Sequence, residues 1–477
     1  MKFYTSTLKL GIIAGGQLGK MLIQEASKWD IATYVLDEDE KGPASSIATC
    51  FFKGSRLDYQ TVYDFGKKVD ILTFEIESIN VDALFQLQKE GIEVIPDPSI
   101  LQLFQNKEKQ KEFYVKNGLP TARYMSLSPS PSLQDSSFES TPSVLARSLP
   151  RFSPRSNLHA TIHSPRPGEV SHLNQPPKQS PCHYEDLEQI TFPFVQKLKT
   201  GGYDGRGVAV IRDENDLVNL LEGDSIIEEL VDIHKEIAVI VARNKDGEVR
   251  CFPAVEMVFN EKANLVEKLI CPANITPEES KEAEAIATKL ITDLNMQGIL
   301  AIEFFVVKDC ETLPESTTSS CEVNPPVVAR SPILNSPRSN RPNQSPCLSP
   351  TPQAGNYSNR ILINESAPRP HNSGHHTIES IMTSQYEQHL RAILNLPLGS
   401  TEIKMPSVML NILGKPDYEG PVYYEWLKEA LAIEGVKIHL YGKKITKPFR
   451  KMGHITILDK DIKKALEKGE QIINYKL

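Results

Sequence analysis

Residues 360–379 of this chain, RILINESAPRPHNSGHHTIE, combine side chains that bind cations, anions and protons within one short segment. The apolar run 361–363 is rich in β-branched residues, as strands are, and leads into Asn364 and Glu365. These two residues offer oxygen ligands that suit a hard cation such as Mg²⁺. The segment therefore predicts a metal-binding position at the end of a strand.

A proline-braced arginine follows this strand. Pro368 and Pro370 flank Arg369 and restrict the backbone, so the guanidinium is presented from a stiff turn where a planar anion can dock. His371 and Asn372 add hydrogen-bonding groups, and the imidazole is a candidate acid or base. An ordinary polar loop would explain any one of these residues. Together they predict an anion site with a proton-handling group.

A second carboxylate lies in another apolar segment, at residues 298–307, where Glu303 is the polar exception. A carboxylate on a buried strand is costly unless it is paired or binds a cation. Glu303 and Glu365 together predict a two-carboxylate Mg²⁺ or Mn²⁺ site that holds nucleotide phosphates. The alternative is a glutamate that faces solvent from a half-exposed strand.

A glycine-rich loop, GGYDGRG, occupies residues 201–207 and follows Lys197. Its glycines let backbone amides approach phosphate oxygens, and Lys197 adds a positive charge. The loop does not match the Walker pattern, and a plain hairpin tip is the alternative. The glycines are Gly201, Gly202, Gly205 and Gly207, and the side chains between them are Tyr203, Asp204 and Arg206.

A strand-like segment at 226–231 continues into Glu236. The backbone of such a connector can hydrogen-bond an adenine while a carboxylate takes the ribose hydroxyls. Charge runs of this kind are also common on solvated surfaces, so the segment by itself leaves both interpretations open.

Taken together, these motifs resemble the ATP-grasp ligases and, among them, the N5-carboxyaminoimidazole ribonucleotide synthetase family. The resemblance extends to GIIAGGQLGKM at 11–21, TFEIE at 73–77 and HLYGKKITKPFRKMGHI at 439–455. It covers nearly the whole chain except two Ser/Pro-rich segments. The chain departs from the family pattern at Phe259, where a polar side chain is usual, and at 447–449, which read Lys-Pro-Phe.

The resemblance implies ATP-dependent carboxylation of aminoimidazole ribonucleotide by bicarbonate through carboxyphosphate, with Mg²⁺ or Mn²⁺ as cofactor and a homodimeric enzyme. It places the metal on Glu303 and Glu365, and the catalytic groups around bicarbonate at Arg369, His371 and Asn372, with Asp204 or His371 taking the amine proton. The implied ATP contacts are Lys107, Lys197, the loop glycines, Glu228, Glu229, Leu230, Val231, Glu236, Asn364 and Glu365. The implied contacts to the imidazole nucleotide are Gln17, Glu75, Tyr203, Asp204, Arg206, Lys443 and Arg450.

Three other functions remain open at this point. A formate-dependent glycinamide ribonucleotide transformylase would share the ATP-grasp residues. An NAD-dependent oxidoreductase would use the glycine-rich turn at 15–19 with Asp37, although Ala14 stands where the dinucleotide fingerprint has its first glycine. A non-catalytic binding protein would recruit partners through the Ser/Pro-rich segments.

Composition narrows the class of protein. The chain has 477 residues, of which 40% are hydrophobic, and a net charge of −8. This acidity argues against broad binding to nucleic acid or to anionic membranes. Seven cysteines without a CxxC pair, and no apolar run of membrane-spanning length, favour a cytoplasmic protein.

We expect a mixed α/β and α+β chain with ATP-grasp architecture. An N-terminal doubly wound α/β domain should fill 1–106, an ATP-grasp domain 107–396, and a small mixed domain 397–477. The segments 128–182 and 310–358 are rich in Ser, Pro, Asn and Arg and are predicted to be disordered. The second separates the strands of Glu303 and Glu365, but closure entropy grows slowly with loop length, so the strands should still pair.

Overall fold

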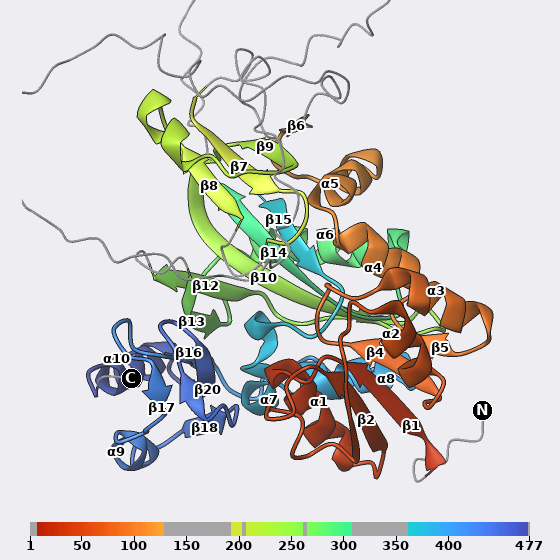
Figure 1. The fold of residues 1–477 in the computed structure, drawn as a ribbon. Helices are drawn as coiled ribbons and strands as arrows, with labels where there is room; N and C mark the ends of the chain where they lie inside the picture. The colour runs from red at the N-terminus through yellow and green to blue at the C-terminus, as the bar shows by residue number, and fades with distance from the viewer. Residues whose placement is uncertain (1–6, 128–191, 203–206, 261–264, 308–360, 476–477) are drawn as a thin grey trace, which may run out of the picture. The chain divides into compact units, whose positions relative to one another are not determined.

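The computed structural model describes residues 7–127, 192–202, 207–260, 265–307 and 361–475 (Figure 1). The predicted disorder of 128–182 and 310–358 concerns residues outside these ranges, as do the expected roles of Tyr203, Asp204, Gly205 and Arg206. The chain divides into two compact units, one formed by 1–122 with 231–477 and the other by 123–230. Each is described separately.

The larger unit begins with a five-stranded parallel sheet in the order β3-β2-β1-β4-β5. Helices follow β1, β3, β4 and β5, which confirms the expected α/β arrangement. Leu10 and Ile12 of β1 pack with helix α1, whereas Ile13 packs with α2 and α3, because successive strand residues face opposite sides. The elements are β1 (Lys9–Ile13), α1 (Gln17–Ser27), β2 (Ala32–Asp37), β3 (Cys50–Lys53), α2 (Tyr59–Gly66), β4 (Ile71–Phe74), α3 (Val81–Lys89), β5 (Glu93–Val94) and α4 (Pro98–Phe104).

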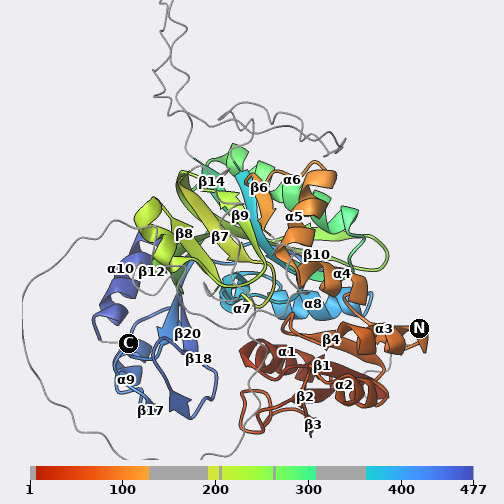
Figure 2. The same ribbon diagram turned by 45° about the horizontal axis from the view of Figure 1, so that its top comes forward.

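A nine-stranded antiparallel sheet follows, with the path β15-β14-β10-β12-β13-β16-β20-β18 and β11 paired to β10. Strands β10, β14 and β15 run side by side (Figure 1, Figure 2). The strands of its first half are β10 (Ile233–Arg243), β11 (Val249–Cys251), β12 (Val255–Asn260), β13 (Leu265–Cys271), β14 (Gly298–Val307) and β15 (Ile361–Ala367).

Helix α6 (Pro277–Asp293) covers one face of this sheet. Leu300, Ile302 and Phe304 of β14 pack towards α6, whereas Ile299 and Ala301 belong to the cluster on the opposite face. Glu303 continues this second face by the alternation of strand side chains. The face away from α6 is therefore the one that carries the conspicuous carboxylate.

The C-terminal segment continues the same sheet, because β13 pairs with β16. The segment expected to form a separate domain from residue 397 thus shares its sheet with the ATP-grasp strands. Its core lies between the sheet and the last helix. Its elements are β16 (Ser407–Leu413), β17 (Gly420–Pro421), α9 (Leu427–Leu431), β18 (Val436–Leu440), β19 (Ile445–Thr446), β20 (Lys451–Leu458) and α10 (Ile462–Ile473).

The smaller unit is a four-stranded antiparallel sheet in the order β6-β9-β7-β8. Phe194, Ile211 and Ile227 form its small apolar core. Its elements are β6 (Tyr124–Leu127), β7 (Phe194–Leu198), β8 (Val208–Ile211), the 3₁₀ helix η3 (Glu214–Asn219) and β9 (Ser225–Glu229). In the part of the chain that the structure describes, across both units, no helix is long and apolar enough to span a bilayer.

Candidate active site

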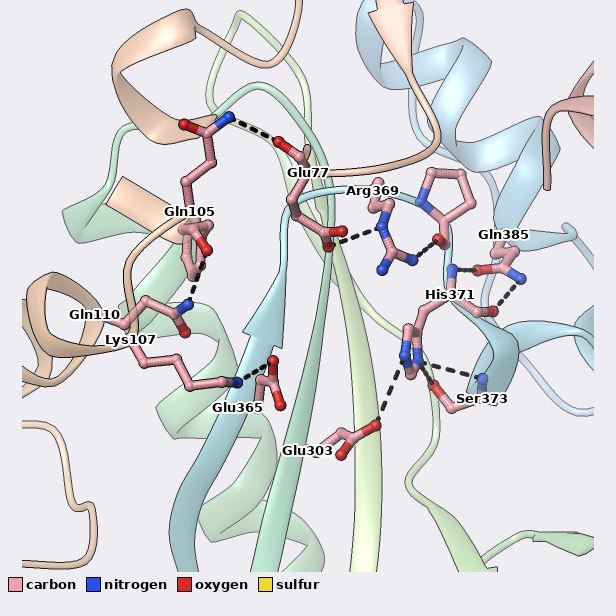
Figure 3. A network of polar contacts seen from close by, with 12 residues as sticks. Glu77, Gln105, Lys107, Gln110, Glu303, Glu365, Arg369, His371, Ser373 and Gln385 are labelled. Atoms are coloured by element: carbon pink, nitrogen blue, oxygen red, sulfur yellow. Dashed lines mark hydrogen bonds and ion pairs between the residues drawn. The ribbon is translucent and has the colours of Figure 1, made fainter. Parts of the chain in front are cut away.

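Glu303 and Glu365 lie directly opposite each other on the antiparallel strands β14 and β15 (Figure 3). The register shifts after this pair, because Phe304 pairs with Ile363 and leaves Asn364 as an extra residue. Such a bulge re-aims side chains near functional sites. The two carboxylates therefore lie close together, as expected. Asn364 directly precedes Glu365 in the sequence.

A lysine and a histidine flank the two carboxylates. Lys107 begins helix α5 (Lys107–Lys116), and its Nζ lies 2.5 Å from Oε1 of Glu365. Nε2 of His371 lies 3.6 Å from Oε1 of Glu303. Each carboxylate thus has one nitrogen side chain nearby (Figure 3). These four residues form the centre of the candidate site.

The electrostatics of this centre favour a cation. Burial, together with the charges of Glu365 and Glu236, raises the pKa of Glu303 to about 8, against the opposing effect of Lys107 and Lys451. A divalent ion would replace the proton that two adjacent carboxylates otherwise retain. No cluster of three or more His, Cys, Asp or Glu ligands occurs within the described ranges. The donor set fits an ion held by two carboxylates and completed by phosphate oxygens.

Arg369 is held in place by neighbouring acceptors. Its Nε lies 2.8 Å from Oε1 of Glu77, and its Nη1 donates to the carbonyl of Pro370 at 3.0 Å. Only 16% of the arginine side chain is exposed. The stiff turn expected from the two prolines therefore carries a guanidinium whose orientation is fixed (Figure 3).

His371 is fixed through both its backbone and its ring. Its backbone N–H donates to Oε1 of Gln385 at 2.9 Å, and Nε2 of Gln385 donates back to the carbonyl of His371 at 2.8 Å. The backbone N–H of Ser373 donates to Nδ1 of the ring. The neutral ring therefore carries its hydrogen on Nε2, the nitrogen that faces Glu303.

Asn372 begins the 3₁₀ turn η4 (Asn372–Gly374). Its side-chain oxygen is buried and has no hydrogen-bond partner among the described residues. A bound water, ion or ligand would supply the partner that such a buried polar atom usually has. Arg369, His371 and Asn372 all lie on the segment that leaves β15.

Buried imidazoles support this loop from behind. His375 stacks on His454 with 4.7 Å between the ring centroids. The hydroxyl of Tyr386 is hydrogen-bonded to Nδ1 of His375, and the hydroxyl of Tyr441 to Nδ1 of His454. Burial lowers the pKa of His375 and of His454 well below the usual histidine value. Both rings are therefore neutral and hold helix α8 (Gln385–Ile393), β20 and the loop together.

Of the residues expected to bind the imidazole nucleotide, Lys443 and Gln17 contact each other. Lys443 Nζ donates to Oε1 of Gln17 at 3.1 Å and to the carbonyl of Lys451 at 2.7 Å. Arg450 instead donates through Nη1 to the carbonyl of Ile445 at 2.8 Å. The expected proximity of Gln17 and Lys443 is thus present.

The side chain of Glu75 is buried against the first residues of helix α1. Its carboxylate accepts hydrogen bonds from the backbone N–H groups of Gly16 and Gly19. Asp37 accepts from the N–H of Gly15 at 2.5 Å. These are amides that a dinucleotide-binding turn would offer to a pyrophosphate. Because carboxylates of the protein already use them, the arrangement argues against the oxidoreductase alternative.

In the smaller unit, Lys197 Nζ lies 2.8 Å from Oε2 of Glu228, and both side chains are less than one-tenth exposed. Glu229 instead pairs with Nε of Arg123 at 2.5 Å. Gly201 and Gly207 adopt φ of +79° and +77°, which favours glycine. Strands β7 and β8, which flank the glycine-rich segment in the sequence, pair antiparallel, with Lys197 opposite Val208.

Three further expected residues belong to the larger unit or border it. Glu236 lies on β10, two residues before the partner of Glu303, and its charge acts on that carboxylate. Leu230 is the last residue of the smaller unit, and Val231 is the first residue of the second part of the larger unit. Leu230 is 38% exposed. Phe259, the departure from the family pattern, packs against the apolar cluster on the face opposite α6.

Sequence reasoning assigned no role to three residues that the structure places in or beside this site. Lys451 acts electrostatically on Glu303 and follows Arg450 in the KPFRKMGHI run, which could have drawn attention to it. Glu77 ends the TFEIE motif but was given no partner. Gln385 carries no sequence signal, because its role depends on the return of α8 to the loop.

Comparison with known proteins agrees with this architecture. Family models match in three parts: an ATP-grasp domain at 178–315 and 356–386, a ribonucleotide synthetase preATP-grasp domain at 7–105, and a phosphoribosylaminoimidazole carboxylase C-terminal domain at 407–468. These ranges follow the order of the three expected domains.

Individual relatives are similar over nearly the whole chain. N5-carboxyaminoimidazole ribonucleotide synthase of Bacillus subtilis is 30% identical, covering 94% of this chain and 91% of its own length. Chloroplastic phosphoribosylaminoimidazole carboxylase of Vigna aconitifolia is also 30% identical over 94% of this chain, which spans 64% of that longer protein.

Solved structures are similar as well. The N5-carboxyaminoimidazole ribonucleotide synthetase of Thermotoga maritima has a TM-score of 0.71 and 36% identity, with 98% of each chain covered. The Aspergillus clavatus synthase, solved with ADP and 5-aminoimidazole ribonucleotide, has a TM-score of 0.70 and 28% identity, with 99% of each chain covered. The chain therefore belongs to the N5-carboxyaminoimidazole ribonucleotide synthase family of ATP-grasp enzymes.

Proposed function

We propose that this protein carboxylates 5-aminoimidazole ribonucleotide with ATP and bicarbonate, releasing ADP and phosphate, as a step of purine biosynthesis. The observation that carries this proposal is the pairing of Glu303 with Glu365 on strands whose exit loop bears Arg369, His371 and Asn372. This pairing supports a metal-bound phosphate site next to a site for a small anion. The substrates named for the related proteins support the choice of nucleotide.

The proposed reaction begins with phosphoryl transfer. A bicarbonate oxygen attacks the γ-phosphorus of ATP, and ADP leaves as carboxyphosphate forms. Mg²⁺ or Mn²⁺ bound by Glu303 and Glu365 would neutralise charge on the phosphates, and Lys107 would add a second positive charge. Arg369 offsets the repulsion between the two anions, which is roughly 4 kcal/mol for one pair of unit charges near contact at a partly buried site.

The second stage is transfer of the carboxyl group to the nucleotide. The exocyclic amine attacks the carboxyphosphate carbon, directly or after release of carbon dioxide, and inorganic phosphate leaves. His371 presents Nε2–H and therefore acts as a hydrogen-bond donor to the departing phosphate oxygens. The amine proton then passes to Asp204, the other group that the resemblance offers as a base.

The remaining assignments follow the same resemblance. Lys197, the glycine-rich turn, Glu228 to Val231 and Glu236 contact ATP, while Gln17, Lys443 and Arg450 contact the imidazole nucleotide. We also infer a homodimer in the cytoplasm, which sedimentation and cell fractionation would test. Neither feature enters the chemistry proposed above.

A coupled assay of ADP formation tests the proposal. With purified protein, ATP and Mg²⁺, turnover should require both bicarbonate and aminoimidazole ribonucleotide, and the carboxylated nucleotide should form in equal amount to ADP. Glycinamide ribonucleotide with formate serves as the matched alternative and should support no turnover. ADP formation only with this second pair, or with neither pair, would reject the proposed reaction.

A further inference from the structure

Glu77 has no role in the metal centre or the nucleotide site described above, yet its carboxylate contacts Arg369 at the candidate anion site. Its Oε1 lies 2.8 Å from Nε of Arg369. The side chains are 26% and 16% exposed respectively, so this pair is partly shielded from water. Figure 3 shows the carboxylate pointing towards the guanidinium from the segment that follows β4.

The backbone around Glu77 is itself anchored. Its carbonyl accepts hydrogen bonds from the N–H of Ile79 at 2.9 Å and from Nε2 of Gln105 at 2.8 Å. Gln105 also donates to the carbonyl of Ile79. The carboxylate therefore projects from a fixed turn and not from a side chain on a loose surface loop.

Two contacts on different nitrogens orient the guanidinium of Arg369. The carboxylate of Glu77 forms an ion pair at Nε, and the carbonyl of Pro370 accepts a hydrogen bond from Nη1. Because the group is planar, two such contacts define both its plane and its rotation within that plane. An arginine side chain otherwise loses considerable rotamer entropy when it binds a ligand. Glu77 reduces this loss by fixing the side chain beforehand.

We propose that Glu77 is the positioning residue for Arg369 and sets the geometry in which the guanidinium receives bicarbonate. The inference rests on the proposed function for the identity of the anion. Glu77 itself touches no reacting atom and acts through Arg369. Its contribution is electrostatic, because the carboxylate of Glu77 forms an ion pair with the guanidinium of Arg369.

Steady-state kinetics with two substitutions test the inference. Glu77→Ala removes this ion pair and should raise KM for bicarbonate by roughly tenfold or more, while KM for ATP changes by less than about twofold. Glu77→Gln keeps the length of the side chain but removes its charge, so it should also raise KM for bicarbonate. Glu93→Ala, which removes a glutamate paired with Lys245 at 3.7 Å elsewhere in the same N-terminal region, is the control.

The inference is overturned if Glu77→Ala leaves KM for bicarbonate unchanged, or if the Ala and Gln variants impair all kinetic constants alike. Should the Ala variant not fold, Glu77→Asp provides the same test, because the shorter side chain cannot reach Nε without movement. A wild-type KM in Glu77→Asp then counts against the inference.

A crystal structure of Glu77→Ala adds a readout that does not depend on activity. The guanidinium of Arg369 should leave the orientation that it has beside Glu77. An unchanged guanidinium would overturn the positioning role even in an active enzyme. Conversely, a wild-type protein that consumes no ATP would reject the proposed function while this structural comparison still stood.

Discussion

Glu303 and Glu365 occupy opposite positions on paired strands even though residues 308–360 separate those strands in the sequence. Two carboxylates at this spacing repel each other, and burial of Glu303 adds to the cost. Lys107 pairs with Glu365 and offsets the raised pKa of Glu303 only in part. The pair is therefore poised to take up a proton or a metal ion, which links its geometry to the chemistry of ATP.

Metal binding should release a proton from Glu303 below pH 8. Its pKa is raised to about 8, chiefly by burial, so the carboxyl group is mostly protonated at pH 6 to 7 and must ionise before it binds a cation. The apparent affinity for Mg²⁺, with a non-hydrolysable ATP analogue present, should rise by about tenfold from pH 6 to pH 7. Calorimetry in two buffers of different protonation enthalpy measures the released proton.

Glu303→Gln is the control for this pH dependence and should flatten it, since the amide does not titrate. Affinity that is constant between pH 6 and pH 8 in the wild type, without proton release, would contradict the assignment of Glu303 as a metal ligand.

Replacing Arg369 by alanine should abolish bicarbonate-dependent phosphate release while ATP still binds. Loss of a preorganised charged donor at an anion site costs about 10²- to 10³-fold in rate. Phosphate release and equilibrium nucleotide binding are the two measurements. Arg391→Ala, which removes an arginine paired with Glu387 one helical turn away, should leave both unchanged. Normal turnover in the Arg369 variant would remove this residue from the mechanism.

Glu75→Ala should destabilise the N-terminal sheet region by about 1 to 3 kcal/mol, because two backbone N–H groups at the start of α1 lose their acceptor. Urea denaturation followed by circular dichroism measures the change. Glu40→Ala, which removes an exposed partner of Lys53, serves as the control. Unaltered stability together with a raised KM for the nucleotide would instead support the substrate contact that the resemblance implies for Glu75.

Acid should weaken the fold through its buried histidines. Burial lowers the pKa of His376 and of His389 to about 3, against 6.5 in an unfolded chain. Above pH 6.5 both histidines are neutral in the folded and in the unfolded protein. Between about pH 3 and pH 6.5 they bind a proton only in the unfolded protein. The free energy of unfolding should therefore fall with decreasing pH by up to about 1.4 kcal/mol per pH unit for each residue.

Urea unfolding at pH 7, 6 and 5 tests this dependence. His389→Gln removes one titrating ring that bonds to Thr73, so its unfolding free energy should vary less steeply with pH. An equal slope in the variant and the wild type would show that other groups account for the effect.

Replacing residues 308–360 by a short turn should preserve activity and stabilise the protein by about 2 kcal/mol, because a shorter connection costs less closure entropy. Val306 already pairs with Ile361, so the ends of β14 and β15 meet where a hairpin turn would join them. Denaturant unfolding and the ADP assay measure the two outcomes. Reduced stability or lost turnover would show that the segment contributes to the folded enzyme.

Local sequence patterns predicted most elements well. The apolar segment at 298–307 has the limits of β14. Helix α6 begins at Pro277, because Thr276 forms a capping box with Glu279. The helix ends at Asp293, shortly before Asn295 adopts a positive φ of 47°. Caps and turns, more than periodicity, set these boundaries.

The sequence by itself determined which chemical groups the site contains: carboxylates at 303 and 365, a guanidinium between two prolines, and an imidazole behind it. Residue types and short-range spacing carry that information, because each motif lies within one strand or turn. Tertiary structure alone decided that Glu303 opposes Glu365, that Glu77 holds Arg369, and that Glu75 is used by α1. Such partners are set by sheet register and side-chain packing between segments distant in the chain, and no local pattern encodes them.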